Sequence, residues 1–236
     1  MTMTSTCNLM RIMPPEGNTV MLYCRRFIAC GFSFPKNRGQ MKGEMKMENR
    51  KNQIQCLAVS SVLIALASVL SLIKLPLPIF LLGGSITLLS MLPVVMISVM
   101  YGIKWGLGSA FAYSLIQLIF GITMEGVLGW GLSPQALIGC ILLDYIVAFT
   151  LLGLAGSFRQ KGHIGICIGT AMVLIFRFLA HFVSGILIFG SIVDKGAWIH
   201  SLTYNGAYML PELILTVTGA AIVFTLPQIK SLVERR

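Results

Sequence analysis

A succession of long apolar segments, each about as long as a bilayer is thick, constrains this chain more than any other feature. Six such segments follow Lys51, and each has roughly the 17–25 residues that a helix needs to cross the hydrocarbon core. Hydrophobic residues make up 56% of the chain and charged residues 11%, whereas soluble domains contain about 25% charged residues. The sequence therefore predicts an all-α integral membrane protein with six transmembrane helices, at approximately residues 53–73, 85–101, 105–122, 134–158, 164–190 and 202–226.

Lysine and arginine residues predict how these spans are oriented. Nine of the eighteen lie within the first 51 residues, and most of the others lie at alternate span ends, at Lys104, at Arg159 and Lys161, and beside the C-terminus. Loops rich in lysine and arginine remain in the cytoplasm. With six spans, both termini are therefore expected to be cytoplasmic, in a multi-pass protein of the cell membrane.

Residues 1–46 differ from the rest of the chain. They combine proline, glycine, asparagine and many basic residues without helical periodicity, and such a composition favours disorder. We interpret them as a disordered basic tail, which precedes a membrane domain over residues 47–236. Met47 opens a short charged leader before the first span and is a candidate alternative start, in which case the tail would not be translated.

Four ionisable side chains lie inside the expected spans: Asp144, Arg177, His181 and Glu212. A charge at this depth is costly, so it usually has a partner or a function. Arg177 and His181 are four residues apart and share one helix face. Because Arg177 lies nearer mid-depth, we expect it mainly to balance a buried carboxylate, either Glu212 or Asp144. His181 lies in the outer half of the membrane with Asp144, and we expect it to face a ligand.

Other residues at similar depth suggest a cavity that opens outward. Asn205 and the adjacent pair Asp144 and Tyr145 fall in the same half of the membrane, and Trp198 precedes the last span. Gly185, on the face of His181, is either a helix-contact glycine or room for a ligand. A carboxylate neutralises positive charge, aromatic faces attract cations, and an amide both donates and accepts. These residues suit a small, planar and cationic solute.

The first span carries a different signal. Ser61 and Ala65 are small residues four positions apart, a spacing that lets another membrane helix approach closely. The pair serves either internal packing or the docking of a partner protein. The sequence contains no GxxxxGK[ST] phosphate loop and no metal-ligand cluster such as HExxH. We therefore expect no cofactor, no metal and no catalytic residue, and the energy for transport would come from a partner or an ion gradient.

Four segments together resemble a known family: "GGSITLLSMLP", "SPQALIGCILLDYIVAF", "RFLAHFVSG" and "AWIHSLTYNGAYMLPE". They are similar to the thiamine-specific substrate-binding (S) component of energy-coupling factor (ECF) transporters, and the similarity covers about residues 53–230. The resemblance implies a six-helix membrane protein that binds thiamine from outside. It also implies the partners, a transmembrane coupling protein and two ATPases, which would hydrolyse the ATP.

The resemblance further implies roles for individual residues. The docking face for the coupling protein corresponds to Ser61 and Ala65. His200 stands where the family commonly has tyrosine. The implied substrate-binding residues are Asp144, Tyr145, His181, Gly185, Trp198, His200 and Asn205.

Three alternatives remain open at this point. Another S component would bind riboflavin or a thiamine precursor such as the aminopyrimidine, although Asp144 favours a cationic or amino-bearing ligand over a neutral flavin. An intramembrane enzyme would use Asp144 and His181 as acid and base, but the sequence shows no second catalytic carboxylate and no nucleophile motif. An ion-coupled carrier would usually be longer and built from repeats. No feature of the sequence suggests nucleic acid.

Overall fold

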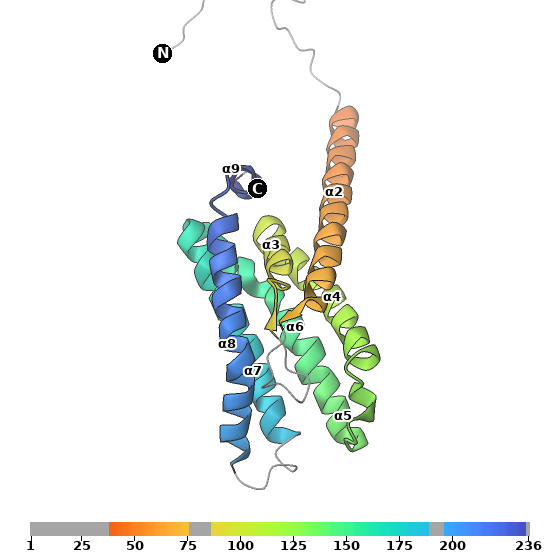
Figure 1. The fold of residues 1–236 in the computed structure, drawn as a ribbon. Coiled ribbons are helices and arrows are strands. Elements are labelled where there is room, and N and C mark those ends of the chain that lie inside the picture. Colours follow the sequence, from red (N-terminus) through yellow and green to blue (C-terminus); the bar gives the residue numbers. More distant parts are fainter. Residues whose placement is uncertain (1–37, 76–85, 189–195, 235–236) are drawn as a thin grey trace, which may run out of the picture. The chain divides into compact units, whose positions relative to one another are not determined.

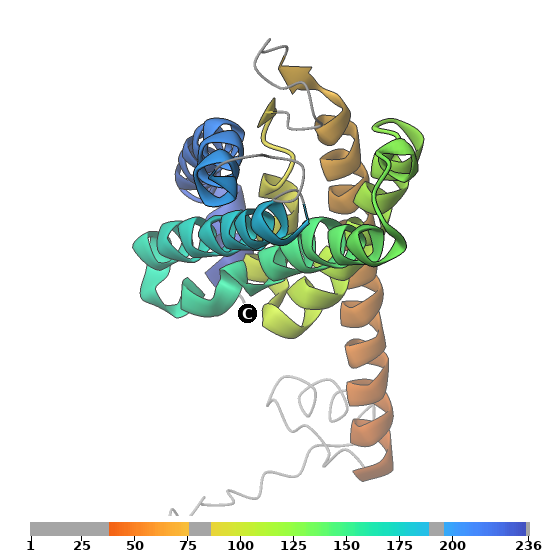
Figure 2. The same cartoon turned by 90° about the horizontal axis from the view of Figure 1, so that it is seen from below.

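The computed structural model describes residues 38–75, 86–188 and 196–234, and nearly all of these residues are helical (Figure 1). Residues 52–236 form one compact unit, to which the following description applies. Figures 1 and 2 show helix α3 and strands β1 and β2 lying between α8 on one side and α4 on the other.

The first helix, α2, runs over Arg38–Leu72. It begins nine residues before Met47, so the expectation of disorder up to residue 46 does not match the structure over 38–46. Apart from two glycines, this stretch consists of arginine, glutamine, methionine, lysine and glutamate, all of which are good helix formers. Residues 1–37 lie outside the described residues, and the division into a tail and a membrane domain stays a prediction.

A short antiparallel strand pair follows α2. Strand β1 (Lys74–Leu75) pairs with β2 (Ile86–Thr87), so that Lys74 is opposite Thr87. The pair brings the end of α2 next to the start of α3 (Leu92–Tyr101). Helix α3 is shorter than the expected span over 85–101, and at 1.5 Å per residue its ten residues cover only about half the hydrocarbon thickness. It is buried on nearly every side.

Helices α3 and α4 (Ile103–Thr123) meet at Gly102. Gly102 has φ 89°, a conformation that glycine adopts without the steric cost of a β-carbon. The adjoining turn is held by Arg159, whose Nη1 donates to the Val99 carbonyl at 3.1 Å. A cation at this place also interacts favourably with the C-terminal end of the α3 dipole.

Residues 134–187 form a continuous apolar helical stretch that reverses direction once. It consists of α5 (Pro134–Cys140), the π-helix η2 (Ile141–Val147), α6 (Ala148–Thr150), the 3-10 helix η3 (Leu151–Lys161) and α7 (Gly162–Leu187). The short 3-10 turn η1 (Val127–Gly129) lies between α4 and α5. Gly165 and Gly169 of α7 lie against the backbone carbonyls of Phe158 and Ala155, so η3 and α7 pack closely and antiparallel.

Helices α8 (Ala197–Val223) and α9 (Pro227–Glu234) complete the chain. Among the described residues, four helical stretches are long and apolar enough to cross a membrane: Arg50–Leu72, Ile103–Thr123, Pro134–Leu187 and Ala197–Val223. This confirms the all-helical membrane fold.

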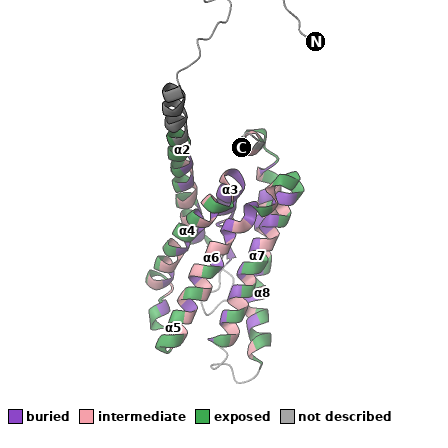
Figure 3. Cartoon of the chain, turned by 180° about the vertical axis from the view of Figure 1, so that it is seen from behind, coloured by how far each residue is buried: buried purple, intermediate pink, exposed green. Residues whose placement is uncertain are grey.

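Burial follows the pattern expected of a helical bundle in lipid (Figure 3). The buried core includes Tyr113 and Leu152, which are fully covered. Large apolar side chains are exposed along the outer faces, among them Ile119 on α4 and Leu210 on α8. A soluble protein rarely exposes apolar surface on this scale, whereas hydrocarbon is the appropriate solvent for it.

Candidate functional site

A cavity of about 400 Å³ lies among α4, η2, α7, α8 and the end of α2. Its lining is mixed, with aromatic and aliphatic side chains and an unusual number of polar ones for the interior of a membrane protein. Six of the seven sequence-predicted binding residues line it: Asp144, Tyr145, His181, Gly185, His200 and Asn205. The seventh, Trp198, is not among the lining residues and is 58% exposed.

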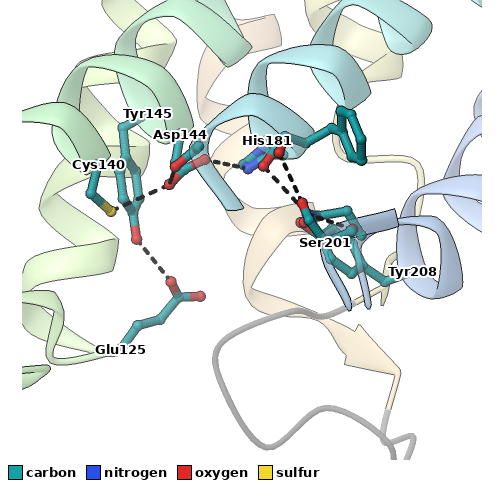
Figure 4. Close-up of polar contacts among 10 residues, drawn as sticks. Glu125, Cys140, Asp144, Tyr145, His181, Ser201 and Tyr208 are labelled. Atoms are coloured by element: carbon teal, nitrogen blue, oxygen red, sulfur yellow. Dashed lines mark hydrogen bonds and ion pairs between the residues drawn. The ribbon is translucent and has the colours of Figure 1, made fainter. Parts of the chain in front are cut away.

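Asp144 and His181 form the central contact of the cavity (Figure 4). His181 Nδ1 lies 2.9 Å from Asp144 Oδ1. The other carboxylate oxygen, Oδ2, accepts from the Ser184 hydroxyl at 2.6 Å and from the Cys140 thiol at 3.3 Å. Because an ionised carboxylate can only accept, Nδ1 of His181 carries a hydrogen in this pair.

The second ring nitrogen of His181 is available to a ligand. Nε2 is buried and has no hydrogen-bond partner among the described residues. In neutral histidine with a hydrogen on Nδ1, Nε2 is an acceptor. A buried polar atom without a partner is costly, so this nitrogen is suited to accept a hydrogen bond from an amino group in the cavity.

The π-helix η2 explains how Asp144 and its neighbour Tyr145 both face the cavity. A π-helix has i→i+5 hydrogen bonds and more residues per turn than an α-helix, so adjacent side chains diverge less in direction. The Tyr145 ring also lies directly against the backbone of Gly121, where a β-carbon would collide with it. Glycine on α4 therefore makes room for a tyrosine on η2.

Tyr145 leads to a second carboxylate, Glu125, which follows α4. The Tyr145 hydroxyl donates to Glu125 Oε2 at 3.1 Å, and Lys74 Nζ lies 2.7 Å from Glu125 Oε1. The Lys74 and Glu125 side chains are 41% and 23% exposed. This ion pair therefore connects β1, at the end of α2, to the turn after α4 across a more open part of the cavity wall.

A third carboxylate, Glu212, lies in the most buried part of the cavity. Arg177 Nη1 is 2.9 Å from Glu212 Oε2, and the two side chains are only 8% and 3% exposed. The Thr87 hydroxyl donates to the other Glu212 oxygen, and the Arg177 guanidinium lies 4.5 Å from the centre of the Phe149 ring. This confirms that Arg177 balances a buried carboxylate, and it identifies that carboxylate as Glu212.

Asn205 and Gly185 hold α7 and α8 together where both line the cavity. Asn205 Nδ2 donates to Ser201 Oγ at 3.1 Å and to the His181 carbonyl at 3.3 Å, and Asn205 Oδ1 accepts from the Tyr208 hydroxyl at 2.8 Å. A β-carbon at Gly185 would collide with Ser201. Of the two interpretations of Gly185, the helix contact is therefore the one that the structure supports.

Aromatic rings form a row along α8. His200 stacks on Tyr204 with ring centroids 6.0 Å apart, Tyr204 meets Tyr208 edge-on at 5.9 Å, and Tyr208 meets His181 edge-on at 6.4 Å. Such faces attract a cation or stack on a flat ring. The row extends from the exposed His200 to the buried Tyr208.

A family model described as "Thiamine transporter protein (Thia_YuaJ)" matches residues 57–232. The chain belongs to the thiamine transporter protein family. Membership makes it a transport protein rather than an enzyme, and a multi-pass membrane protein, in agreement with its apolar helices.

Two relatives and one solved structure agree with this assignment. A protein called "Thiamine transporter ThiT" from Bacillus subtilis is 33% identical over 156 residues, which cover 60% of this chain and 76% of the relative. A protein of the same name from Lacticaseibacillus paracasei is 27% identical over 158 residues, which cover 59% and 73%. The structure of ThiT from Listeria monocytogenes, at 22% identity, covers 75% of this chain and 98% of its own with a TM-score of 0.60, which supports a shared fold.

In this member of the thiamine transporter family, Ser61 and Ala65 lie on an exposed face of α2. A different face of α2 is attached to α4 by two hydrogen bonds: Trp105 Nε1 donates to Ser60 Oγ at 2.8 Å, and Gln117 Nε2 donates to Ser71 Oγ at 2.9 Å. Internal packing therefore does not account for Ser61 and Ala65 within the part of the chain that the structure describes, and docking stays a prediction.

Sequence reasoning missed several cavity residues of this family member. Ser184 and Cys140 could have been found, because they lie three residues after His181 and four before Asp144, on the same helix faces. Lys74 and Glu125 lie where helices end, and periodicity carries no signal there. The only available hint was that Glu125 is the one acidic residue in the loop "TMEGVLGWGLSPQ".

Proposed function

We propose that this chain is the substrate-binding membrane subunit of an ECF-type importer, and that it captures thiamine outside the cell for uptake driven by a partner module. Family membership and the names of its relatives support thiamine as the substrate. ATP hydrolysis falls to two ATPase subunits, which act through a transmembrane coupling protein. That assembly follows from the resemblance to S components.

The charge of the cavity carries this proposal. Three carboxylates line it, Glu125, Asp144 and Glu212, against two side chains that are positively charged at neutral pH, Lys74 and Arg177. With neutral histidines the cavity therefore has a net charge of minus one (two positive, three negative). Thiamine joins a neutral aminopyrimidine to a thiazolium ring with one positive charge, so the excess negative charge of the cavity favours it over a neutral or anionic ligand.

The neutral end of the ligand fits the Asp144–His181 contact. Nε2 of His181, which has no partner among the described residues, accepts from the exocyclic amino group, and Asp144 fixes the histidine in the tautomer that can accept. Tyr145 and the aromatic row on α8 flank the flat rings. Asn205 and Gly185 position α7 against α8, His200 contributes an aromatic face, and Trp198 is assigned to the outer rim.

The proposed topology has six spans with both termini in the cytoplasm. Two contacts support it by grouping the expected cytoplasmic ends. Arg159 Nη1 donates to the Val99 carbonyl beside the α3–α4 turn, and His163 Nε2 lies 2.8 Å from the Ala221 carbonyl oxygen near the end of α8. The chain reverses between η3 and α7 at Gly162, in the same expected cytoplasmic loop. Helix α3 crosses as a buried, shortened span together with the residues before it.

Titration calorimetry on the purified full-length chain, with mass spectrometry of any co-purifying small molecule, tests the function. We expect thiamine to bind without ATP or an ion gradient, and riboflavin not to bind. The aminopyrimidine alone should bind more weakly than thiamine because it lacks the cationic ring. Riboflavin binding with no response to thiamine would refute the proposal, and equal affinity for thiamine and the aminopyrimidine would favour a precursor as the substrate.

A further inference from the structure

The three carboxylates of the cavity differ in how firmly the protein compensates their charge. Glu212 is paired with Arg177, and both side chains are almost fully buried, at 3% and 8% exposed. Asp144 receives hydrogen bonds or an ion-pair contact from three side chains: His181, Ser184 and Cys140. Glu125 is paired with Lys74, whose side chain is 41% exposed. The Glu125 pair is therefore the one that water reaches most easily.

Exposure decides which of these pairs can be exchanged for a ligand. Breaking a buried pair leaves an uncompensated charge, which is strongly unfavourable. Partly exposed pairs contribute little, because water screens the attraction and solvates the released side chain. Lys74 can leave Glu125 for water at small cost, whereas Arg177 cannot leave Glu212. Among the cavity carboxylates, Glu125 is the one whose positive partner can be replaced.

Glu125 is also in the right place relative to the Asp144–His181 contact. Its Oε2 accepts from the hydroxyl of Tyr145, and Tyr145 directly follows Asp144 in the chain. Both carboxylates line the same cavity. Asp144 is next to the backbone of Tyr145, and Glu125 is at its hydroxyl group. A ligand with a neutral ring at Asp144 and a linked cationic ring could therefore reach Glu125 without leaving the cavity.

We propose that Glu125 is the counter-ion for the positive ring of the ligand, and that Lys74 occupies this place in the empty cavity. Binding then exchanges one cation for another, and the total charge around Glu125 stays balanced in both states. The exchange breaks the ion pair between Lys74 of β1 and Glu125 in the turn after α4. This inference rests on the proposed function, since it requires a ligand with one cationic and one neutral ring.

The test compares thiamine with its neutral aminopyrimidine fragment at mildly alkaline pH, using titration calorimetry on the full chain. Glu125→Gln should weaken thiamine binding by about 5- to 30-fold, the size of one partly desolvated charge contact, with little effect on the fragment. Lys74→Gln should strengthen thiamine binding by about two- to fivefold, because a weak competing pair is removed. The double variant should behave like Glu125→Gln alone.

Lys104→Gln is the matched control, because it removes one exposed lysine charge outside the cavity and should bind both ligands like the wild type. Weaker thiamine binding by Lys74→Gln, or equal weakening of both ligands by Glu125→Gln, would show that the pair is only structural and overturn the inference. Lys74→Gln remains decisive if Glu125→Gln does not fold. A wild type that does not bind thiamine would instead refute the proposed function.

Discussion

The buried pair of Arg177 and Glu212 provides the sharpest test of how this membrane interior is stabilised. Arg177→Met keeps an unbranched side chain of similar length but removes the charge. Glu212 would then lose its charged partner and keep the hydrogen bonds from the hydroxyl and the backbone of Thr87, with its side chain 3% exposed. Removing one partner of such a pair costs about 3–5 kcal/mol. The lost contact with the Phe149 ring adds about 1–2 kcal/mol, so the total approaches the whole stability of many domains.

A double variant separates the pair from its parts. Glu212→Gln alone leaves Arg177 without its counter-charge and should destabilise to a similar extent. Arg177→Met combined with Glu212→Gln removes both charges while the amide can still accept from Thr87. Because a buried pair replaced as a whole is often nearly neutral, the double variant should lose at most about 2 kcal/mol relative to the wild type.

Expression level and melting curves in detergent, measured without ligand, decide between these outcomes. Both single variants should express poorly or melt early, and the double variant should recover most of the loss. If the destabilisation in the double variant equals the sum of the two single effects, Arg177 and Glu212 act independently and the pair does not stabilise the fold. A single Arg177→Met variant that melts like the wild type would refute the argument directly.

Three further variants test other parts of the site. His181→Ala removes the acceptor Nε2 and an aromatic face, so thiamine affinity should fall about 5- to 150-fold in calorimetry; unchanged affinity with an early melt would make it a core residue. Gly121→Ala puts a β-carbon into the Tyr145 ring, so it should cost about 1–3 kcal/mol of stability and weaken thiamine binding. A normal melting curve would contradict the expected loss of stability. Ala65→Trp, on the exposed face of α2, should block thiamine uptake by cells while the isolated subunit still binds. Loss of both together would assign Ala65 to internal packing.

The Arg177–Glu212 pair shows how much of the site can be predicted from residue spacing and expected membrane depth. The sequence placed one arginine at mid-depth and offered two carboxylates to balance it. It could not choose between Glu212 and Asp144, because the choice depends on how α7, α8 and η2 are rotated about their axes. Helix packing determines that rotation. Gly185 brings α7 against Ser201 of α8, and Asp144 pairs with His181 rather than with Arg177.

Other features could not be predicted because they break the periodicity on which the prediction depends. The π-helix η2 changes the directions of Asp144 and Tyr145 relative to an α-helix, and the sequence contains no marker for it. Helix α3 is apolar all round and buried, so it resembles a lipid-exposed span in sequence, and its true length was missed. Lys74 and Glu125 lie at helix ends, where their meeting depends on the β1–β2 pair and the α4 turn.

The hydrogen bonds in the cavity also bear on how tightly it can bind a ligand without an energy source. Asp144, Tyr145 and Asn205 are held by hydrogen bonds to protein partners, so the protein itself fixes the positions of these side chains. Binding to such preorganised groups requires little ordering of side chains, and this preserves affinity. Nε2 of His181 has no hydrogen-bond partner in the part of the chain that the structure describes, so a ligand amino group would add a hydrogen bond there. A cavity arranged in this way favours capture of the solute, and under the proposed function the energy supplied by the partner module would be needed for its release.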